Sequence, residues 1–333
     1  MADLVSMQKK IALLHRYPKN RIKETNAAFP FLESRGIKVL TFKTFDRLSN
    51  LKKFWKSILW IFYAPLLVIG EKYDVIYCDD SFPFYPALVK LASPKSKVII
   101  RIGDLHLMYN YSGVVYKFLH FLERISWIMA DEIIAISEVM ADYIEQEIGR
   151  RPKVVLDPVD PKDFDIKAAC DGSVMFHGTL TKNKNVDLII EAAKRMPETD
   201  FVIIGDGPDF KRLAKISESN VFFHGWVPFK DIKHHIASCA VGLALRSNNP
   251  GNEYVVTSPF LQYGIMGKPC LVTRRKVFGD YPHQFVGVNE MVEKLKILLK
   301  APREEGEKLR KFILENHDAK KKSEEIWEIL TQA

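Results

Sequence analysis

The residues best suited to chemistry stand at the ends of apolar runs between Val174 and Thr273. The run VMFH is followed by Gly178 and, within the same GTLTKNKN segment, by Lys184. Glycine lets a ligand approach the backbone, and lysine supplies a point charge for a phosphate. Since a glycine and a lysine in a loop are often only a turn and a solvated side chain, the pair alone leaves both interpretations open.

Two further segments in the same region suit a phosphate. The apolar run FVII ends in Gly205, Asp206 and Gly207, which predicts a tight turn after a buried strand. Ser258 and Pro259 are expected to begin a helix, with the serine as N-cap and the proline at the first helical position. The free N–H groups and the dipole of such a helix suit a diphosphate. A turn made for geometry alone and a simple capped helix are the alternatives.

Apolar runs alternate with helix-like stretches along the whole chain, which predicts parallel α/β structure covered on both faces. In the N-terminal half, strands are expected at 11–17, 37–42, 74–79, 97–103, 132–137 and 153–157, and helices at 24–34, 83–92, 113–129 and 138–148. In the C-terminal half, a first strand from Val174 is expected to close at Gly178, with further strands at 201–205, 221–225, 241–245 and 270–273, and helices near 229–238, 258–266 and 289–299. Ligands bind such sheets at the carboxyl ends of the strands.

The chain of 333 residues is long enough for two domains. Residues 158–172 are rich in Pro and Asp and have no sustained period, so we expect a linker there. The domains would then span 1–157 and 173–300, with a ligand-binding cleft between them. The charged tail 301–333 is expected to be helical and to pack back toward the N-terminal domain.

Composition excludes several classes of protein. An apolar fraction of 47% is too high for a disordered chain. The four cysteines lie far apart without C-x-x-C or Cys/His ligand spacing, so neither a zinc site nor a disulfide framework is expected. No apolar run with a cleavage site begins the sequence, so we expect no secretory signal and a cytoplasmic protein. The net charge of +8 is not accompanied by a nucleic-acid-binding motif, so nucleic acid is not expected as a partner.

The segment 51–70, LKKFWKSILWIFYAPLLVIG, is the one stretch that suggests a membrane. Lys52, Lys53 and Lys56 precede an apolar run of about 12 residues, whereas a bilayer-spanning helix needs about 20. A basic flank and two tryptophans are typical of an interfacial helix on anionic lipid, at the inner face of the membrane. A buried core helix is the alternative. An interfacial helix would indicate a lipid or lipid-linked acceptor.

The stretch 174–273 resembles the donor domain of GT-B glycosyltransferases, in the retaining group-1 (family-4) branch. GTLTKNKNVDLIIEAAK is similar to that family's G-[RS]-L-x-x-x-K-[GN] segment, FVIIGDGP to its strand and G-x-G-P turn, and QYGIMGKPCLVT to its E-[AY]-x-A-x-G-K-P-V segment. ADEIIAISEVMADYIEQEIG resembles the end of the family's acceptor domain. The resemblance implies two Rossmann-like doubly wound domains, the N-terminal one for the acceptor and the C-terminal one for a nucleotide-sugar donor.

The resemblance also implies roles for individual residues. Lys184 matches the lysine that neutralises the donor diphosphate, Val227 falls where backbone meets the base, and Gln262 takes the place of the glutamate that binds the ribose. The implied donor-binding residues are Gly178, Thr179, Gly205, Asp206, Gly207, Val227, Arg246, Glu253, Tyr254, Ser258, Pro259 and Gln262.

Two departures from the family pattern concern charge. Thr179 stands where an arginine often follows the first glycine, and Arg246 or Lys182 could replace that arginine. Gln262 can still accept a hydrogen bond from a ribose hydroxyl, but the charge-assisted bond is lost, on the order of 1 kcal/mol.

Two further positions are undecided from the sequence. The family's first glutamate falls on Tyr254, with Glu253 beside it, so the residue that contacts the sugar stays open. In the acceptor domain, RIGDLH places Gly103 at the histidine of a His-Asp pair found in relatives, followed by Asp104 and then His106. Asp104 and His106 are candidate catalytic residues that orient a substrate hydroxyl, and a capping Asp with an exposed His is the alternative.

The resemblance implies a retaining hexosyltransferase that moves a sugar from a nucleotide-diphosphate donor to a glycan or lipid-linked acceptor. Fixed charges and amides would stabilise the leaving phosphate, which would take the acceptor's proton, so no metal or other cofactor is expected. Thr179 and Gln262 leave a catalytically silent nucleotide-sugar-binding protein as an alternative, and a GT-B-fold epimerase is another.

Overall fold

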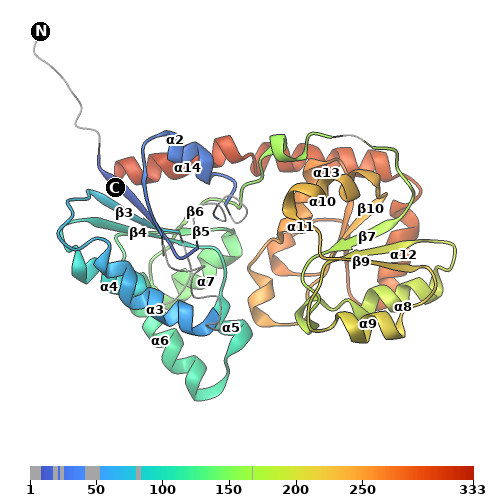
Figure 1. Cartoon of the computed structure of the whole chain (residues 1–333), viewed down its shortest axis with the longest axis horizontal. Helices are drawn as coiled ribbons and strands as arrows, with labels where there is room; N and C mark the ends of the chain where they lie inside the picture. The colour runs from blue at the N-terminus through green and yellow to red at the C-terminus, as the bar shows by residue number, and fades with distance from the viewer. Residues whose placement is uncertain (1–8, 18–21, 23–25, 42–52, 80–83, 167) are drawn as a thin grey trace, which may run out of the picture. The chain divides into compact units, whose positions relative to one another are not determined.

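The computed structural model describes residues 9–17, 22, 26–41, 53–79, 84–166 and 168–333. These residues form two compact units, each with its own sheet and core (Figure 1). The first unit comprises Met1–Pro158 together with Ala319–Ala333, and the second comprises Val159–Asp318. The predicted fold class, with two doubly wound parallel sheets and C-terminal helices, is confirmed.

In its described part the first unit has a six-stranded parallel sheet in the order β2-β1-β3-β4-β5-β6. Its strands are β1 (Ile11–His15), β2 (Lys38–Thr41), β3 (Val75–Cys78), β4 (Lys97–Ile102), β5 (Glu132–Ala135) and β6 (Lys153–Val154). Every residue of β1 and β3 is buried, as expected for a sheet covered on both faces. Because β1 pairs with β2 on one side and β3 on the other, the carboxyl ends of β1 and β3 form the switch point at which such sheets bind ligands.

Helices cover both faces of this sheet. The short helix α2 (Phe29–Ser34) and the C-terminal helix α14 (Ala319–Gln332) pack together over one face (Figure 1). The other face carries α4 (Tyr85–Ala92), flanked by α3 (Lys53–Leu66) and α6 (Gly113–Met129). The remaining helices, α5 (His106–Asn110) and α7 (Glu138–Ile148), both pack against α6.

The second unit has a parallel sheet in the order β12-β11-β10-β7-β8-β9. Its strands are β7 (Val174–His177), β8 (Phe201–Ile204), β9 (Val221–Gly225), β10 (Val241–Ala244), β11 (Cys270–Thr273) and β12 (Gln284–Phe285). Counted from β7, this is the 3-2-1-4-5-6 order of dinucleotide-binding folds. The switch point therefore lies between β7 and β10, where the sequence places the GTLTKNKN segment.

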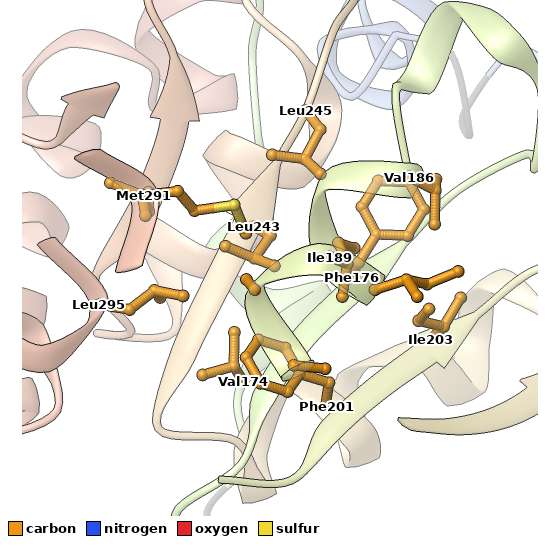
Figure 2. Packing of buried hydrophobic residues seen from close by; sticks show 14 of the residues in the cluster. Val174, Phe176, Val186, Ile189, Phe201, Ile203, Leu243, Leu245, Met291 and Leu295 are labelled. Atoms are coloured by element: carbon orange, nitrogen blue, oxygen red, sulfur yellow. The ribbon is translucent and has the colours of Figure 1, made fainter. Parts of the chain in front are cut away.

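Two apolar cores hold the second unit together. Side chains of β7, β8 and β10 such as Phe176 and Leu243 pack on α8 (Asp187–Arg195) and α12 (Gly287–Leu298), for example on Met291 (Figure 2). The opposite face is covered by α10 (Phe229–Ser238), α11 (Ser258–Ile265) and α13 (Pro302–Asn316). Each large side chain buried in this way contributes roughly 1.5–3 kcal/mol.

Part of the stretch 158–172, where we expected a linker, packs with the second unit. Val159 and Phe164 are buried in its core, and the 3₁₀ helix η1 (Pro161–Phe164) lies against α10 and α11. Asp160 accepts a hydrogen bond from the backbone of Lys162, so an aspartate that suggested a linker caps this turn. The tail is likewise divided, since α13 packs on α11 of the second unit while α14 packs on the first.

Candidate functional site

The two loops at the switch point of the second unit are tied together by Asn183. Its side-chain Oδ1 accepts hydrogen bonds from Ser247 Oγ at 2.7 Å and Asn252 Nδ2 at 3.0 Å. Its backbone oxygen accepts a further one from the N–H of Ser247 at 2.9 Å. The loop after β7, which carries Lys184, is therefore held against the loop after β10.

The predicted glycine turns allow two loops to touch. Gly178 and Gly205 have φ angles of 147° and 140°. A Cβ on Gly205 would lie 1.9 Å from the carbonyl oxygen of Gly178, and one on Gly207 would lie 2.3 Å from that of Leu180. Leu180 N–H also donates to the backbone oxygen of Asp206 at 3.0 Å. Gly205 and Gly207 are thus required by close backbone packing, whether or not a ligand touches them.

Lys184 ends the 3₁₀ helix η2 (Lys182–Lys184) and is half-buried beside the end of β7. The last residue of β7 is His177, which is buried. Burial, and then the positive charge of Lys184, lower the pKa of His177 from 6.5 to about 3, so the ring is neutral at physiological pH. The sequence analysis did not identify His177 as a candidate. Its signal was a polar residue at the end of a buried strand, directly before Gly178.

The helix α11 begins one residue earlier than we predicted. Its N-cap is Thr257, with extended backbone angles of −86° and 142°, so Ser258 and Pro259 are the first two helical residues. The prediction of Ser258 as N-cap is wrong, because the backbone oxygen of Thr257 already accepts the N–H of Phe260 at 3.0 Å. The side chain of Thr257 makes no capping hydrogen bond.

Four buried polar atoms near this edge of the sheet lack a hydrogen-bond partner within the described residues. They are His177 Nε2, Asn252 Oδ1, Thr257 Oγ1 and Gln262 Oε1. The ring of Tyr263, adjacent to Gln262 on α11, lies 5.1 Å from the ring of His177, so α11 runs beside the end of β7. Because an unsatisfied buried polar atom costs about 1–3 kcal/mol, this edge is suited to a polar ligand or to bound water.

Glu253, a candidate sugar-binding residue, has its carboxylate engaged by the loop after β11. Its Oε2 accepts the N–H of Lys276 at 2.9 Å, and its Oε1 lies 3.8 Å from Arg275 Nε. Arg275 also donates to the backbone oxygens of Arg246 and Ser247 at 2.7 and 2.6 Å. In this arrangement Glu253 and Arg275 fix the shape of the loop after β10.

The other predicted donor-binding residues lie around the same edge. Thr179 and Lys182 are exposed on the loop after β7, and Tyr254 follows the 3₁₀ helix η3 (Pro250–Glu253). Val227, after β9, packs against the core on the α10 side. The structure thus brings the predicted residues after β7, β8, β9 and β10 to one edge of one sheet, with the amino end of α11.

In the first unit, the candidate catalytic residues Asp104 and His106 follow β4. Asp104 Oδ1 accepts the N–H of Leu105 at 2.8 Å, which matches the capping alternative. The Oδ2 atom of Asp104 lies 3.6 Å from His106 Nδ1, beyond hydrogen-bond distance, and both side chains are partly exposed.

A buried ionic network that sequence reasoning missed lies at the same edge of the sheet. Arg101, inside β4, donates to Asp79 Oδ1 at 3.2 Å and to Asp157, and Asn26 Nδ2 donates to the other oxygen of Asp79 at 2.8 Å. Burial raises the pKa of Asp157 to about 6 although Arg101 opposes it, and the charges of Asp79 and Asp104 raise it further. The signal was Arg101 among the buried apolar residues of β4, where a charge must be paired.

Two doubly wound parallel sheets, with the second in the dinucleotide-binding order, define the GT-B class of fold. Residues 171–300 match the family model described as glycosyl transferases group 1, and residues 26–163 match that of glycosyltransferase family 4. The chain is therefore a glycosyltransferase with the GT-B fold. A comparison with curated proteins gave no match.

Solved structures agree on the fold. A sucrose-phosphate synthase from Thermosynechococcus elongatus is 11% identical, with a TM-score of 0.76 over 98% of this chain and 99% of that one. The lipopolysaccharide outer core galactosyltransferase WaaB is 17% identical, with a TM-score of 0.65 over 97% of this chain and 100% of that one. The pneumococcal O-GlcNAc transferase GtfA is 14% identical, with a TM-score of 0.63 over 83% of this chain and 60% of that one.

Proposed function

We propose that the chain transfers a sugar from a nucleoside-diphosphate sugar to a hydroxyl of a glycan or lipid-linked acceptor, with retention of the anomeric configuration and without a metal. The bond between the sugar's anomeric carbon and the diphosphate breaks, and a bond to the acceptor oxygen forms. The acceptor proton passes to the departing phosphate, and a nucleoside diphosphate is released.

The observation that carries this proposal is the convergence at the switch point of the second unit. Lys184 supplies a positive charge beside the end of β7, and the amino end of α11 supplies N–H groups and the positive end of its dipole. Both features stabilise negative charge that grows on a leaving diphosphate. The similar structure of GtfA is a complex with UDP and GlcNAc, which supports a nucleotide and a sugar as the ligands proposed here.

Gln262 fits the ribose of such a donor. Its Oε1 is sequestered and unpaired in the described part of the chain, so it can accept a hydrogen bond from a ribose hydroxyl. The unpaired Nε2 of the neutral His177 lies near Lys184 and can meet the same ligand. These two atoms would gain the partners that they otherwise lack.

A panel of UDP-, GDP- and ADP-sugars tests the proposal. Transfer and donor hydrolysis are measured in the presence of a chelator, and the anomeric configuration of the product is read by proton NMR. Lys184→Ala should lower kcat at least about tenfold, which corresponds to about 1.4 kcal/mol of transition-state stabilisation. Lys211→Ala, at an exposed position of α9 (Phe210–Ile216), is the matched control and should keep the wild-type rate.

Each alternative has its own outcome in this experiment. Binding of a nucleotide sugar without turnover on any acceptor would make the chain a silent binding protein, and a changed sugar on the released nucleotide would make it an epimerase. An inverted product would refute retention alone. A wild-type rate in Lys184→Ala would remove the assigned role of that lysine.

A further inference from the structure

The helix α3 carries apolar side chains on two opposite sides. Trp60 and Ala64 are buried, with Val68 just after the helix. The exposed side carries Trp55, Leu59, Phe62, Leu66 and, beyond the helix end, Ile69, which recur at helical spacing. The described part of 51–70 is therefore buried on one side only, and its exposed side is apolar as well. Lys52 lies outside the described residues.

The helix α6 repeats this pattern independently. Its exposed stripe consists of Val114, Val115, Phe118, Phe121 and Ile128, while Trp127 and Ser126 face the protein. The sequence predicts a helix at 113–129 but does not single out its exposed stripe, because its buried and exposed apolar residues together have the pattern of an ordinary core helix.

Both striped helices, α3 and α6, pack against the helix α4 (Figure 1). Leu91 of α4 is exposed as well. Monomeric soluble proteins rarely expose large contiguous apolar patches without a partner, and apolar side chains exposed on three helices that pack in sequence are candidates for such a patch. No helix in the described residues has the length and apolarity to cross a bilayer.

The charges on these helices indicate what kind of partner fits the exposed apolar side chains. α3 and α4 contain no Asp or Glu, and the one acidic residue of α6, Glu123, is buried against His120. Lys117 of α6 and Lys95 after α4 are exposed and positive. In the described residues of these three helices the exposed side bears cations and no exposed carboxylate, which is complementary to a bilayer with anionic headgroups.

We propose that the exposed sides of α3 and α6, with Leu91, form a membrane-docking face that binds an anionic bilayer surface. Trp55, Phe62, Phe118 and Phe121 insert at the boundary between headgroups and acyl chains, and Lys117 pairs with anionic headgroups. This docking face specifies where the acceptor of the proposed function comes from. It rests on that function for one point only, namely that an enzyme docked in this way takes its acceptor from the membrane.

Sedimentation of the full chain with vesicles tests the docking face. One set of vesicles is phosphatidylcholine alone, and the other contains phosphatidylglycerol as well. The wild type should bind the anionic vesicles, and Phe62→Ser combined with Phe118→Ser should lower the partition coefficient at least about tenfold. The matched control combines Ile297→Ser with Phe222→Ser in the second unit, where the side chains are 63% and 45% exposed against 65% and 61% for Phe62 and Phe118.

Charge and self-association are separated by two further measurements. Lys117→Glu should weaken binding to the anionic vesicles and leave binding to phosphatidylcholine unchanged. Light scattering without vesicles reports self-association: a wild-type dimer that becomes monomeric in the Phe62/Phe118 variant, with no vesicle binding, would make this face a contact between copies and overturn the proposal. Equal vesicle binding by the variant and the wild type would overturn it as well.

The docking proposal and the proposed function can fail separately. The Phe62/Phe118 variant should keep the wild-type rate with a water-soluble acceptor, since the substitutions lie outside the donor site. Vesicle binding without transfer from any nucleotide sugar would leave the docking face intact and remove the proposed function.

Discussion

His177 is a histidine that its surroundings keep neutral. In the unfolded chain it protonates near pH 6.5, whereas the folded protein protonates it near pH 3. Between these values the unfolded state binds the proton and the native state does not, so the stabilisation present above pH 6.5 is lost as the pH falls toward 3. The loss from this group is about 1.4 kcal/mol per pH unit. We expect His177→Leu to flatten the decline of the unfolding free energy between pH 6.5 and 5, measured by urea denaturation.

A substitution at His234 is the control for this prediction. His234→Leu replaces an exposed histidine of α10 in the same way and reports what the loss of a histidine does to this slope. An unchanged slope in His177→Leu would mean that folding does not lower the pKa of this ring. In that event its surroundings would not be what keeps His177 neutral.

The glycines of the turn after β8 allow a stability prediction at single positions. In Gly207→Ala the new Cβ would meet the backbone of Leu180 at 2.3 Å, so a loop must move and we expect a loss of about 3 kcal/mol in unfolding free energy. Gly172→Ala is the control, since Gly172 has φ of 82° but open space around its Cβ. Only backbone strain acts there, and about 1 kcal/mol is expected. Thermal denaturation of both variants decides whether close packing is the reason for the Gly207 requirement.

At the scale of elements, the side chain and backbone of Asn183 hold the loop after β7 against the loop after β10. Asn183→Ala removes the acceptor of Ser247 Oγ and Asn252 Nδ2, and we expect it to raise KM for the donor several-fold, with a loss of about 1–3 kcal/mol in stability. Asn183→Asp keeps both hydrogen bonds and should retain more of the affinity. Steady-state kinetics with the preferred donor measure both effects. Equal KM values in all three proteins would show that the coupling does not position Lys184.

The pattern of apolar runs was enough to predict most elements. α6, α7 and α10 have the predicted bounds, and β9 and β11 do too, because their apolar periods end at clear polar or glycine positions. β12 has two residues and α5 has five, so neither is long enough to show a period, and neither was predicted. Periodicity also could not decide between a buried and a surface position for α3, since both of its sides are apolar.

The candidate site was predictable where local sequence determines position. Gly178, Lys184 and α11 follow strands of one parallel sheet, so their common edge follows from topology. The partners of Asn183 and Arg101 were not predictable, because these contacts join segments far apart in the chain. No local pattern in a single sequence reports which distant carboxylate pairs with an arginine.

At the scale of the whole molecule, the two C-terminal helices serve different units. Ile313 of α13 is buried in the core of the second unit, and Ile326 of α14 is buried in that of the first. Consecutive stretches of one tail therefore stabilise separate cores, and residues 319–333 complete a unit whose other residues precede 159. The composition of the tail could not show that its two helices belong to different units, since both helices are charged and amphipathic.

This arrangement predicts a crossed effect of two matched substitutions. Ile326→Ala should lower the stability of the first unit, and Ile313→Ala that of the second, each by about 3 kcal/mol, because each leaves a cavity in one core. Hydrogen exchange resolves the two units: protection of β1 and β3 should fall in Ile326→Ala, and protection of β7 and β10 in Ile313→Ala. If both variants lost protection equally in both sheets, the units would unfold as one cooperative body, and the C-terminal helices would have to couple the two cores energetically.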